Sequence, residues 1–375
     1  MKVLITGGMG FIGRAVTKKL IESSVNSITI VDPLTEKIHG PDAKPFDFMN
    51  PMVNFIKGDI SDRAVIEPLL LSADAVIHLA AETGTGQSMY EIELYNKVNI
   101  TATSLMLDIL SNNKHKIKKF LVASSRAIYG EGKYTCNQHG AVYPNARLDK
   151  DMSKGDFEVK CPFCATNCNV EATTEDSLIH PSSFYGITKH FQESIVMTMC
   201  PNIGIAPVAL RYQNVYGPGQ SLNNPYTGIL SIFSNLLRAG KNIEIFEDGQ
   251  ESRDFVFIED VADATAASLL NEKANNQILN IGSGVSTSVI DVANTLKMLY
   301  GSSSKLSVNG KYRIGDIRHN FADISRAKEA IGFTPRYDFK NGIKCFTDWV
   351  NTQEVKSDDS YKRSLEEMKQ KNLYK

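Results

Sequence analysis

The chain has 375 residues, of which 42% are hydrophobic and 22% charged, so it can bury a large core and is neither fibrous nor disordered. Its formal net charge of -1 excludes an overall field that attracts nucleic acid or an anionic membrane. No apolar stretch approaches the roughly 18 residues that span a bilayer, and we expect a cytoplasmic protein without nucleic-acid or membrane partners. Three of the six cysteines fall within residues 161–168, and in a reducing cytosol such crowding favours a metal over disulfides.

Short β-branched runs alternate with helical patterns through the first half of the chain. We predict amphipathic helices at residues 11–23 and 99–112. The predicted buried strands are residues 3–6, 27–31, 53–56, 75–79, 120–123 and 208–211. This alternation is typical of an α/β fold with a doubly wound parallel sheet of Rossmann type, here formed by residues 1–130 and 183–211.

Three later stretches depart from this pattern. Residues 131–182 are rich in Cys, Pro, Gly, Asn and charge and lack periodicity, which indicates an insertion. Residues 212–355, with turn-rich segments such as 216–228, are interpreted mainly as a smaller substrate-binding lobe from which some segments return to the sheet. The chain ends in a charged tail, residues 356–375.

The sequence VLITGGMGFIG places Gly7, Gly10 and Gly13 between the first strand and the first helix. In this pattern the first glycine makes the tight turn, the second lets the backbone approach a pyrophosphate, and the third lets the helix pack on the strand. Asp32 closes the second strand 19 residues after Gly13, where a carboxylate accepts hydrogen bonds from an adenosine ribose. We therefore predict a dinucleotide site that favours NAD over NADP, with Lys37 nearby as the residue that weakens this preference.

Tyr185 and Lys189 form a Y-x-x-x-K pair whose spacing places both on one helix face. A nearby ammonium stabilises a phenolate and lowers the tyrosine pKa toward neutrality. Tyr185 is thus a candidate to remove a proton from a sugar hydroxyl while a hydride leaves the same carbon for the cofactor. We expect Ser125, after the strand FLVAS, to hydrogen-bond the same oxygen.

Together these motifs resemble the extended short-chain dehydrogenase/reductases that act on nucleotide sugars, a family of NAD-dependent epimerases and dehydratases. The segments that carry the resemblance occur in the family's order: VLITGGMGFIG, GDISD, HLAAETG, VNITAT, LVASSRAIYGE, YGITK, LRYQNVYGPGQ, RDFVFIEDVA and GDIRHNFADISRAKEAIGF. Within the family, AAETGTGQSMYEI, VDPLTEKIHG, SSRAIYGEG and the cysteine insertion are most similar to the bacterial 4-epimerases of dTDP-L-rhamnose.

The resemblance implies a role for each matching position. Ser125 and Asn214 would face the sugar nucleotide, and Arg253 and Arg313 would supply the charges for its diphosphate, with Arg318 as a competing candidate. The implied cofactor contacts are Gly7, Gly10, Phe11, Ile12, Gly13, Asp32, Asp59, Ile60, Leu79, Ala80, Ala81, Asn99, Tyr185 and Lys189.

The run Ser125-Arg126-Ala127 departs from the related 4,6-dehydratases, which carry Thr-Asp-Glu there and use the two acids for water elimination. Ser124 is an alternative to Ser125, but alignment through the shared Tyr-Gly that follows selects Ser125.

The favoured function is accordingly an NAD-dependent nucleotide-sugar 4-epimerase, an isomerase that oxidises C4 to a 4-keto sugar and reduces it again on the opposite face. The expected substrate is a dTDP-deoxysugar such as dTDP-L-rhamnose. A nucleotide-sugar reductase, dehydrogenase or 4,6-dehydratase remains the alternative, and a non-catalytic sensor is opposed by the intact Ser125, Tyr185 and Lys189. The family also implies a homodimer formed by the helix from about Asn99 and the helix that carries Tyr185.

Two short-spaced pairs, Cys136-x-x-His139 and Cys161-x-x-Cys164, are separated by 21 residues within the insertion. Each pair can chelate from a knuckle-like turn, and together they supply the tetrahedral soft ligands of structural zinc. Such a closed site leaves no position for substrate, so we assign it to folding the insertion. Cys168 is an alternative to His139, and unliganded or redox thiols are the alternative to a metal.

Three remaining residues are given structural roles. We expect Cys200 and Cys345 to be buried small apolar residues. His78 ends a predicted strand and is expected to be structural rather than catalytic.

Overall fold

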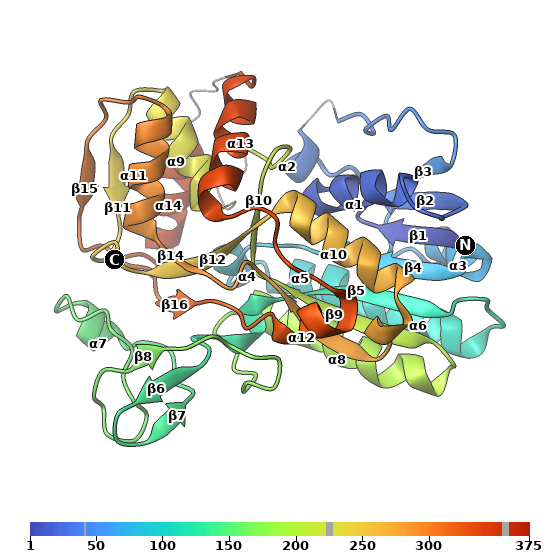
Figure 1. The fold of residues 1–375 in the computed structure, drawn as a ribbon, viewed down its shortest axis with the longest axis horizontal. Helices are drawn as coiled ribbons and strands as arrows, with labels where there is room; N and C mark the ends of the chain where they lie inside the picture. Colours follow the sequence, from blue (N-terminus) through green and yellow to red (C-terminus); the bar gives the residue numbers. More distant parts are fainter. Residues whose placement is uncertain (41–42, 223–227, 355–359) are drawn as a thin grey trace.

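A parallel β-sheet lies at the centre of the molecule, between two layers of helices (Figure 1). The structure is a computed structural model and describes residues 1–40, 43–222, 228–354 and 360–375. The seven strands run in the order β13-β9-β5-β4-β1-β2-β3, which confirms the Rossmann-type doubly wound sheet. Their bounds are Lys2–Thr6 (β1), Ser27–Asp32 (β2), Val53–Lys57 (β3), Ala75–His78 (β4), Lys119–Ser125 (β5), Ala206–Tyr212 (β9) and Gln277–Ile281 (β13).

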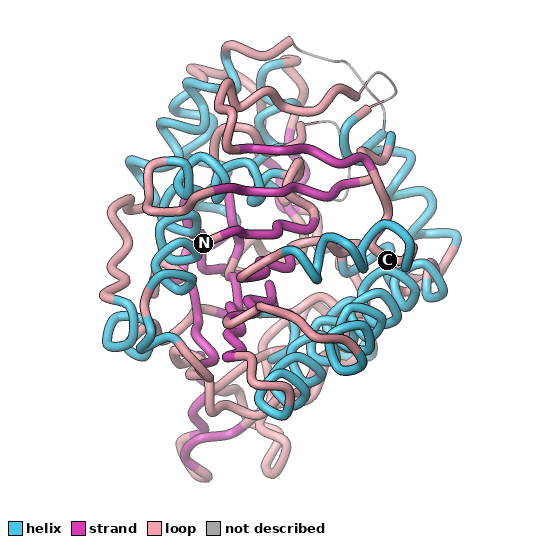
Figure 2. Tube along the Cα trace, turned by 90° about the vertical axis from the view of Figure 1, so that its right-hand side faces the viewer, coloured by secondary structure: helices cyan, strands magenta, loops and turns pink. Residues whose placement is uncertain are grey.

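Both faces of this sheet are covered, which explains why its strands read as continuous apolar runs. In β1, Val3 and Ile5 pack on one face and Leu4 on the other. One face is covered by α1 (Phe11–Ile21), α10 (Ile258–Leu270) and α12 (Ser325–Ile331), and the other by α3 (Arg63–Ser72), α6 (Ala102–Asn112) and α8 (Phe184–Asn202). Figure 2 shows the strands between helices on either side. No helix in the described part of the chain has the length and apolar character needed to cross a membrane.

Short elements link this framework. The helix expected at 99–112 starts as a π-helical turn at Asn96–Thr101 and continues as α6. The other short elements are α2 (Glu36–His39), α4 (Thr85–Ser88), α5 (Ile92–Tyr95) and the 3₁₀ turns η2 (Arg126–Tyr129) and η3 (Glu272–Ala274).

A second lobe stands at the carboxyl edge of the sheet and has its own apolar core. It contains α9 (Ile229–Arg238), α11 (Val289–Leu299), α13 (Phe339–Asn351), α14 (Ser360–Gln370), and the strand pair β11 (Ile243–Ile245) and β15 (Leu306–Val308). A four-stranded sheet of β10 (Asn214–Tyr216), β12 (Ser252–Phe257), β14 (Ser286–Ser288) and β16 (His319–Asn320) joins this lobe to the Rossmann sheet. Residues 223–227 of the predicted turn-rich segment, residue 355 at the end of the predicted lobe and residues 356–359 of the tail lie outside the described residues.

The insertion projects from the rest of the molecule (Figures 1 and 2). Its strands β6 (Tyr134–Cys136), β7 (Gly140–Val142) and β8 (Asn169–Val170) form a small sheet, and α7 (Asp149–Met152) precedes the second cysteine pair. The two ends of the insertion meet where the His180 N–H donates to the Ile128 carbonyl at 2.9 Å.

Candidate active site

The glycine-rich turn joins β1 to α1 at the carboxyl edge of the sheet. Gly7 has a φ of +69°, a left-handed conformation that favours glycine, and its N–H donates to the Val31 carbonyl at 2.9 Å. A Cβ on Gly7 would lie 2.7 Å from the Ala80 nitrogen, and one on Gly13 would lie 2.5 Å from the Gly8 Cα. Only glycine fits at these positions, so the backbone stays bare where a Rossmann fold binds pyrophosphate.

The first turn of α1 offers backbone donors to an anion. Gly10 is the N-cap residue and makes no side-chain cap, and the helix opens with Phe11, Ile12 and Gly13. The N–H groups of a first helical turn have no acceptor within the helix, and the helix dipole adds partial positive charge there. This cradle therefore fits the pyrophosphate of a dinucleotide.

Asp32 lies beside this turn at the end of β2, with 4% of its surface exposed. Its carboxylate accepts hydrogen bonds from the N–H groups of Met9 at 3.1 Å and Leu34 at 2.9 Å, and His39 Nε2 is 3.5 Å away. These contacts fix the carboxylate where the ribose of a dinucleotide lies in a Rossmann fold. The side chain of Lys37, which bears on the choice between NAD and NADP, lies outside the described part of the structure.

The loops after β3 and β4 contain the next group of predicted cofactor residues. Asp59 Oδ1 accepts from the Ser61 N–H at 2.8 Å and so closes the turn after β3, in which Ile60 is buried. Leu79, Ala80 and Ala81 follow β4, and the contact distance given above places Ala80 against the glycine-rich turn. All five residues are therefore at the same edge of the sheet as Asp32.

Asn99 is fully buried and joins the loop after β4 to α8. Its Oδ1 accepts from the Glu82 N–H at 2.8 Å, and its Nδ2 donates to the Glu82 carbonyl at 3.1 Å and to Thr188 Oγ1 at 2.9 Å. Both amide donors are thus used within the protein, and Asn99 acts by holding this loop to the helix that carries Tyr185.

Ser125 and Tyr185 meet at the end of β5. Tyr185 lies in the first turn of α8, where its N–H donates to Ser88 Oγ at 2.9 Å. Burial raises the pKa of Tyr185, while a hydrogen bond with the Ser125 side chain and the positive charge of Arg126 lower it. Ser124 Oγ is buried and makes no hydrogen bond among the described residues, so Ser125 is the serine that contacts the tyrosine.

Lys189 shares a helix face with Tyr185, but its ammonium is directed to other acceptors. Lys189 Nζ donates to the Ala123 carbonyl at 2.9 Å and to Gln192 Oε1 at 2.8 Å. The side chain is 3% exposed, and burial lowers the pKa of Lys189 to about 7. Tyr185 and Lys189 are therefore neighbours without a direct hydrogen bond.

His78 belongs to a buried polar chain beneath this site. Its Nδ1 is 2.7 Å from Thr6 Oγ1, and its Nε2 is 2.9 Å from Thr103 Oγ1 and 3.1 Å from Gln192 Nε2. Burial lowers the pKa of His78 to about 3, so the ring is neutral at ordinary pH. These contacts give His78 a structural role, as expected from the sequence.

A cavity of about 270 Å³ opens between this edge of the sheet and the second lobe. Arg126 Nε donates to Asn214 Oδ1 at 2.6 Å inside it. Arg253 Nη2 donates to Asp316 Oδ1 at 3.0 Å, and the Arg313 guanidinium lies 5.0 Å from the centre of the Phe246 ring. The polar residues of the wall include Thr85, Arg126, Ser182, Ser183, Asn214, Glu244, Glu251, Arg253, Arg313, Asp316 and Tyr361.

Arg318, the competing candidate for the diphosphate, is not part of this cavity, and that prediction is wrong. Its side chain is fully buried and donates to Glu158 Oε1 at 2.7 Å, Asp248 Oδ2 at 2.7 Å and Glu247 Oε2 at 2.9 Å. Arg147 reaches the same Glu247 at 2.7 Å. The guanidinium of Arg318 is thus neutralised by protein carboxylates and links the insertion to the second lobe.

The sequence interpretation missed the role of the C-terminal segment. Tyr361, Met368 and Leu373 line the cavity, and Met368 is 4% exposed. Backbone hydrogen bonds at 3.0 Å from Ile314 to Leu373 and from Tyr312 to Lys375 attach the chain end to both sides of Arg313. The sequence does contain a signal for this segment. Within the predicted charged tail, Tyr361, Leu365 and Met368 recur at intervals of four and three residues, which is typical of an apolar helix face.

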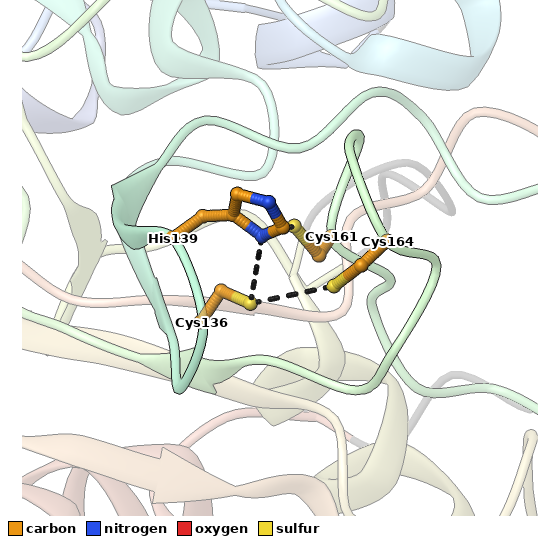
Figure 3. A group of neighbouring side chains, drawn as sticks. All are labelled: Cys136, His139, Cys161 and Cys164. Atoms are coloured by element: carbon orange, nitrogen blue, oxygen red, sulfur yellow. Dashed lines mark hydrogen bonds between the residues drawn. The ribbon is translucent and has the colours of Figure 1, made fainter.

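The four predicted metal ligands gather within the insertion (Figure 3). The ligand atoms of Cys136, His139, Cys161 and Cys164 all lie within 4.8 Å of one another. Cys136 Sγ is 3.6 Å from both His139 Nδ1 and Cys164 Sγ, and Cys161 Sγ is 3.6 Å from His139 Nδ1. Sulfur ligands about 2.3 Å from a tetrahedral zinc ion are separated by about 3.8 Å, close to the distances observed here, so this donor set fits such an ion.

Cys168 borders this group, since it packs in the same buried cluster as Cys136 and Cys161. Its thiol donates to the Thr166 carbonyl at 3.8 Å. Cys200 is buried as expected. Cys345 is exposed, which corrects the expectation of burial, because it lies on the solvent side of α13 while Ile343 and Phe346 face the core.

The fold and this site together define a Rossmann-type enzyme of the short-chain dehydrogenase/reductase class. The chain belongs to the NAD dependent epimerase/dehydratase family, whose model matches residues 3–146 and 161–282. The resemblance seen in the sequence is thereby confirmed.

Individual relatives cover almost the whole chain. A dTDP-L-rhamnose 4-epimerase of Burkholderia thailandensis is 36% identical over 93% of this chain and 94% of its own length. The crystal structure of a UDP-glucose 4-epimerase of Thermotoga maritima with UDP-glucose has a TM-score of 0.75 at 28% identity, over 94% of this chain and 99% of that chain. A UDP-glucuronic acid 4-epimerase of Bacillus cereus, in complex with UDP-glucuronic acid and NAD, has a TM-score of 0.74 at 25% identity with the same coverage.

Proposed function

We propose that this protein is an NAD-dependent nucleotide-sugar 4-epimerase. The observation that carries the proposal is the Ser125–Tyr185 hydroxyl pair. This pair lies at the same carboxyl edge of the sheet as the bare glycine-rich turn, and an arginine-lined cavity opens at that edge. We further propose a dTDP-deoxysugar such as dTDP-L-rhamnose as the substrate, since the relative from B. thailandensis carries that activity at 36% identity.

The proposed cofactor contacts are those at the carboxyl edge of the sheet. The turn from Gly7 to Gly13 would hold the pyrophosphate of NAD, and Asp32 the adenosine ribose. When bound, NAD supplies the acceptor for the C4 hydride and returns it to the other face of the sugar. Tyr185 and Lys189 complete the proposed cofactor site from α8.

The chain's own residues move the proton and hold the sugar nucleotide. Tyr185 removes the proton of the C4 hydroxyl, while Ser125 hydrogen-bonds the same oxygen. Tyr185 returns the proton to that oxygen after the 4-keto sugar has turned over. We assign the diphosphate to Asn214, Arg253 and Arg313, because their polar groups converge on one cavity.

The alternative dehydratase chemistry is disfavoured by the residues that follow Ser125. Dehydratases place two acids there, whereas this chain places Arg126 in the cavity and Ala127 next to it. A reductase would use the same three residues as an epimerase, but it would consume reduced cofactor in each turnover.

The test combines cofactor analysis with stereochemistry. The purified protein is denatured to identify released nicotinamide cofactor, and the native protein is incubated with dTDP-L-rhamnose while NMR follows the configuration at C4. Inversion without added cofactor is expected, and Tyr185→Phe should abolish it while bound NAD is retained. Consumption of added NADH with a 4-keto sugar, in place of inversion, would overturn the epimerase assignment in favour of a reductase.

We also propose that Cys136, His139, Cys161 and Cys164 bind a structural zinc ion, with Cys168 as the alternative to His139. The support is the 3.6 Å separation of adjacent ligand atoms. Metal analysis of the purified protein should find one zinc per chain, lost in Cys161→Ser and retained in the control Cys200→Ser. Equal zinc content in the two variants would contradict the assignment.

A homodimer is proposed from an apolar stripe on α8. Ile187, Phe191 and Met199 are 37%, 48% and 37% exposed and recur at intervals of four or eight residues, on one helix face. Ile92 and Leu94 of the neighbouring α5 are also exposed. Light scattering should give a dimer that Phe191→Glu converts to a monomer, and a monomeric wild-type protein would refute the proposal.

A further inference from the structure

The C-terminal segment, residues 360–375, lies across the sugar-nucleotide cavity and reaches the Rossmann domain. Met368 is 4% exposed and lines the cavity, and a Cβ on Gly86 of α4 would lie 3.5 Å from its Sδ. Lys371 Nζ is 5.8 Å from the centre of the Tyr90 ring, which follows α4. The helix α4 in turn accepts the hydrogen bond from the N–H of the catalytic tyrosine described above. The segment is therefore in contact with the wall of the cavity that adjoins the catalytic helix.

The last residues of the segment pair with the chain on both sides of Arg313. Arg313 and Tyr374 are partners in an antiparallel bridge. Tyr312 and Lys375 exchange two backbone hydrogen bonds at 3.0 Å and 3.1 Å, next to the bond from Ile314 described above. Successive side chains of an extended chain point in opposite directions, and Tyr312 packs against the insertion. The pairing therefore directs Arg313 away from the insertion and into the wall of the cavity.

An aromatic stack holds the Arg313 side chain. Its guanidinium lies 5.0 Å from the centre of the Phe246 ring, and the Tyr374 ring centre lies 5.2 Å from that of Phe246. Arg313 Nε is buried and has no hydrogen-bond partner within the described residues. A guanidinium stacks through its face and donates through its edge. The stack therefore leaves an unpaired donor at the edge of Arg313, for which a diphosphate oxygen in the cavity is a suitable acceptor.

A carboxylate of the insertion anchors the same junction. Asp149 Oδ1 accepts from the Tyr312 hydroxyl at 2.7 Å, and Asp149 Oδ2 accepts from Lys375 Nζ at 2.6 Å. The two residues that exchange backbone hydrogen bonds thus share one side-chain partner. The position of Arg313 consequently depends on both the chain end and the insertion.

We propose that residues 360–375 are a binding element for the nucleoside diphosphate part of the substrate. Tyr374 positions Arg313, which touches the diphosphate. Met368 and Leu373 supply apolar contacts to the nucleoside. This inference rests on the proposed function, because it assigns a further segment to the same site. Since the segment contacts the ligand, docking of the segment and binding of the ligand stabilise each other.

The first test places a charge on α14 of the full chain. Met368→Glu puts a carboxylate at a buried position, and Gln370→Glu, its matched control, puts one at an exposed position of the same helix. Calorimetry measures the binding of dTDP and of UDP. A buried carboxylate without a partner is costly, so the helix should leave the cavity wall. Met368→Glu should weaken the nucleotide that wild type binds by about tenfold or more, Gln370→Glu should match wild type, and both should retain NAD.

The second test separates the positioning of Arg313 from general packing. Tyr374→Ala removes the ring from the stack and keeps the backbone pairing, while Tyr374→Phe keeps the ring. A nucleoside diphosphate carries one more phosphate than its monophosphate, so the ratio of the two affinities reports the diphosphate contact. This ratio should fall roughly three- to tenfold in Tyr374→Ala, as expected for a weakened charged hydrogen bond, and Tyr374→Phe should restore it.

A third measurement uses wild type alone. A ligand that contacts a segment stabilises it against local opening by a factor that approaches 1 + [L]/Kd. At a nucleotide concentration of about 100 Kd, the amide protons of residues 360–375 should therefore exchange up to about 100-fold more slowly than without nucleotide. Peptides from α3 should keep their exchange rate.

The outcomes distinguish the two proposals. If wild type binds neither dTDP nor UDP, the proposed function fails. If wild type binds a nucleotide but does not invert C4, the epimerase assignment fails, while the variants still test the binding element.

The role of the segment is refuted if binding in Met368→Glu and Tyr374→Ala equals that in Gln370→Glu and the exchange of residues 360–375 is unchanged. Equal loss of the diphosphate and the monophosphate in Tyr374→Ala would refute the positioning of Arg313. If Met368→Glu loses NAD or does not fold, the Tyr374 variants and the exchange of wild type decide between these results.

Discussion

Replacing Arg318 by methionine should destabilise the attachment of the insertion to the second lobe. The methionine keeps much of the apolar stem but removes the guanidinium that joins Glu158 of the insertion to Glu247 and Asp248 of the lobe. Since Arg318 is fully buried and Glu247 is 5% exposed, the loss leaves negative charge without its partner inside the protein.

The expected magnitude follows from the exposure of each partner. Breaking a buried ion pair costs about 3–5 kcal/mol. Glu158 and Asp248 have side chains 38% and 44% exposed, and Arg147 still pairs with Glu247 at 2.7 Å, so water and Arg147 compensate in part. We therefore expect Arg318→Met to lower the free energy of unfolding by about 3 kcal/mol, which is the lower end of the range for a broken buried ion pair.

The assay is urea unfolding followed by circular dichroism, with Arg63→Met as the matched control. Arg63 is 49% exposed and pairs with Asp108 and Glu67, which are 53% and 32% exposed, so its loss should cost about 0–1 kcal/mol. If Arg318→Met costs no more than Arg63→Met, the cluster does not stabilise the fold and the reasoning is wrong.

Three further predictions concern pH, substrate affinity and helix capping. Burial raises the pKa of Glu131 to about 7 from 4.5, so the folded state binds the extra proton and stability should fall as pH rises between those values; Glu131→Gln should flatten this part of the pH–stability curve. Met368→Ala removes an apolar contact of about 1.5 kcal/mol from the cavity wall and should raise KM about tenfold in steady-state kinetics, without loss of bound NAD. Asp338 caps α13 by accepting from the Asn341 N–H at 2.7 Å, and Asp338→Ala should cost about 1 kcal/mol in thermal unfolding while kcat is unchanged.

The features that could be predicted from the sequence are those determined by nearby residues. The inner strands of the first half, such as β1 and β4, are recognisable because they are buried on both faces and are therefore largely apolar. The edge strand β3 is only partly buried and carries Asn54 and Lys57. The glycine-rich turn is recognisable because Gly7 and Gly13 lie where no Cβ fits. Cys136 and Cys164 are brought together from two local pairs whose spacing already indicates a chelating turn.

The rest depends on contacts between distant segments. The neighbouring residues do not distinguish Arg253 from Arg318 as candidates for the diphosphate. Only the folded chain shows that Arg318 is enclosed by carboxylates from two separate segments while Arg253 lines the cavity. The sequence indicates only that Arg126 stands where dehydratases carry an acid. The folded chain shows in addition that Arg126 lines the cavity and donates to Asn214. The exposure of Cys345 could have been predicted from the sequence. The apolar residues of α13 form one helix face, and Cys345 does not lie on that face.

The hydrogen bond from the His180 N–H to the Ile128 carbonyl holds the two ends of the insertion next to each other. Because the ends of the insertion are adjacent, a segment of this kind can be gained, lost or exchanged without moving the strands beneath it. The family match is interrupted at residues 147–160, inside this segment. A homologue that lacks it needs only a short loop from Gly130 to Pro181. Such a homologue loses Glu158 and Arg147 together, so Arg318 becomes the remaining cation that pairs with Glu247.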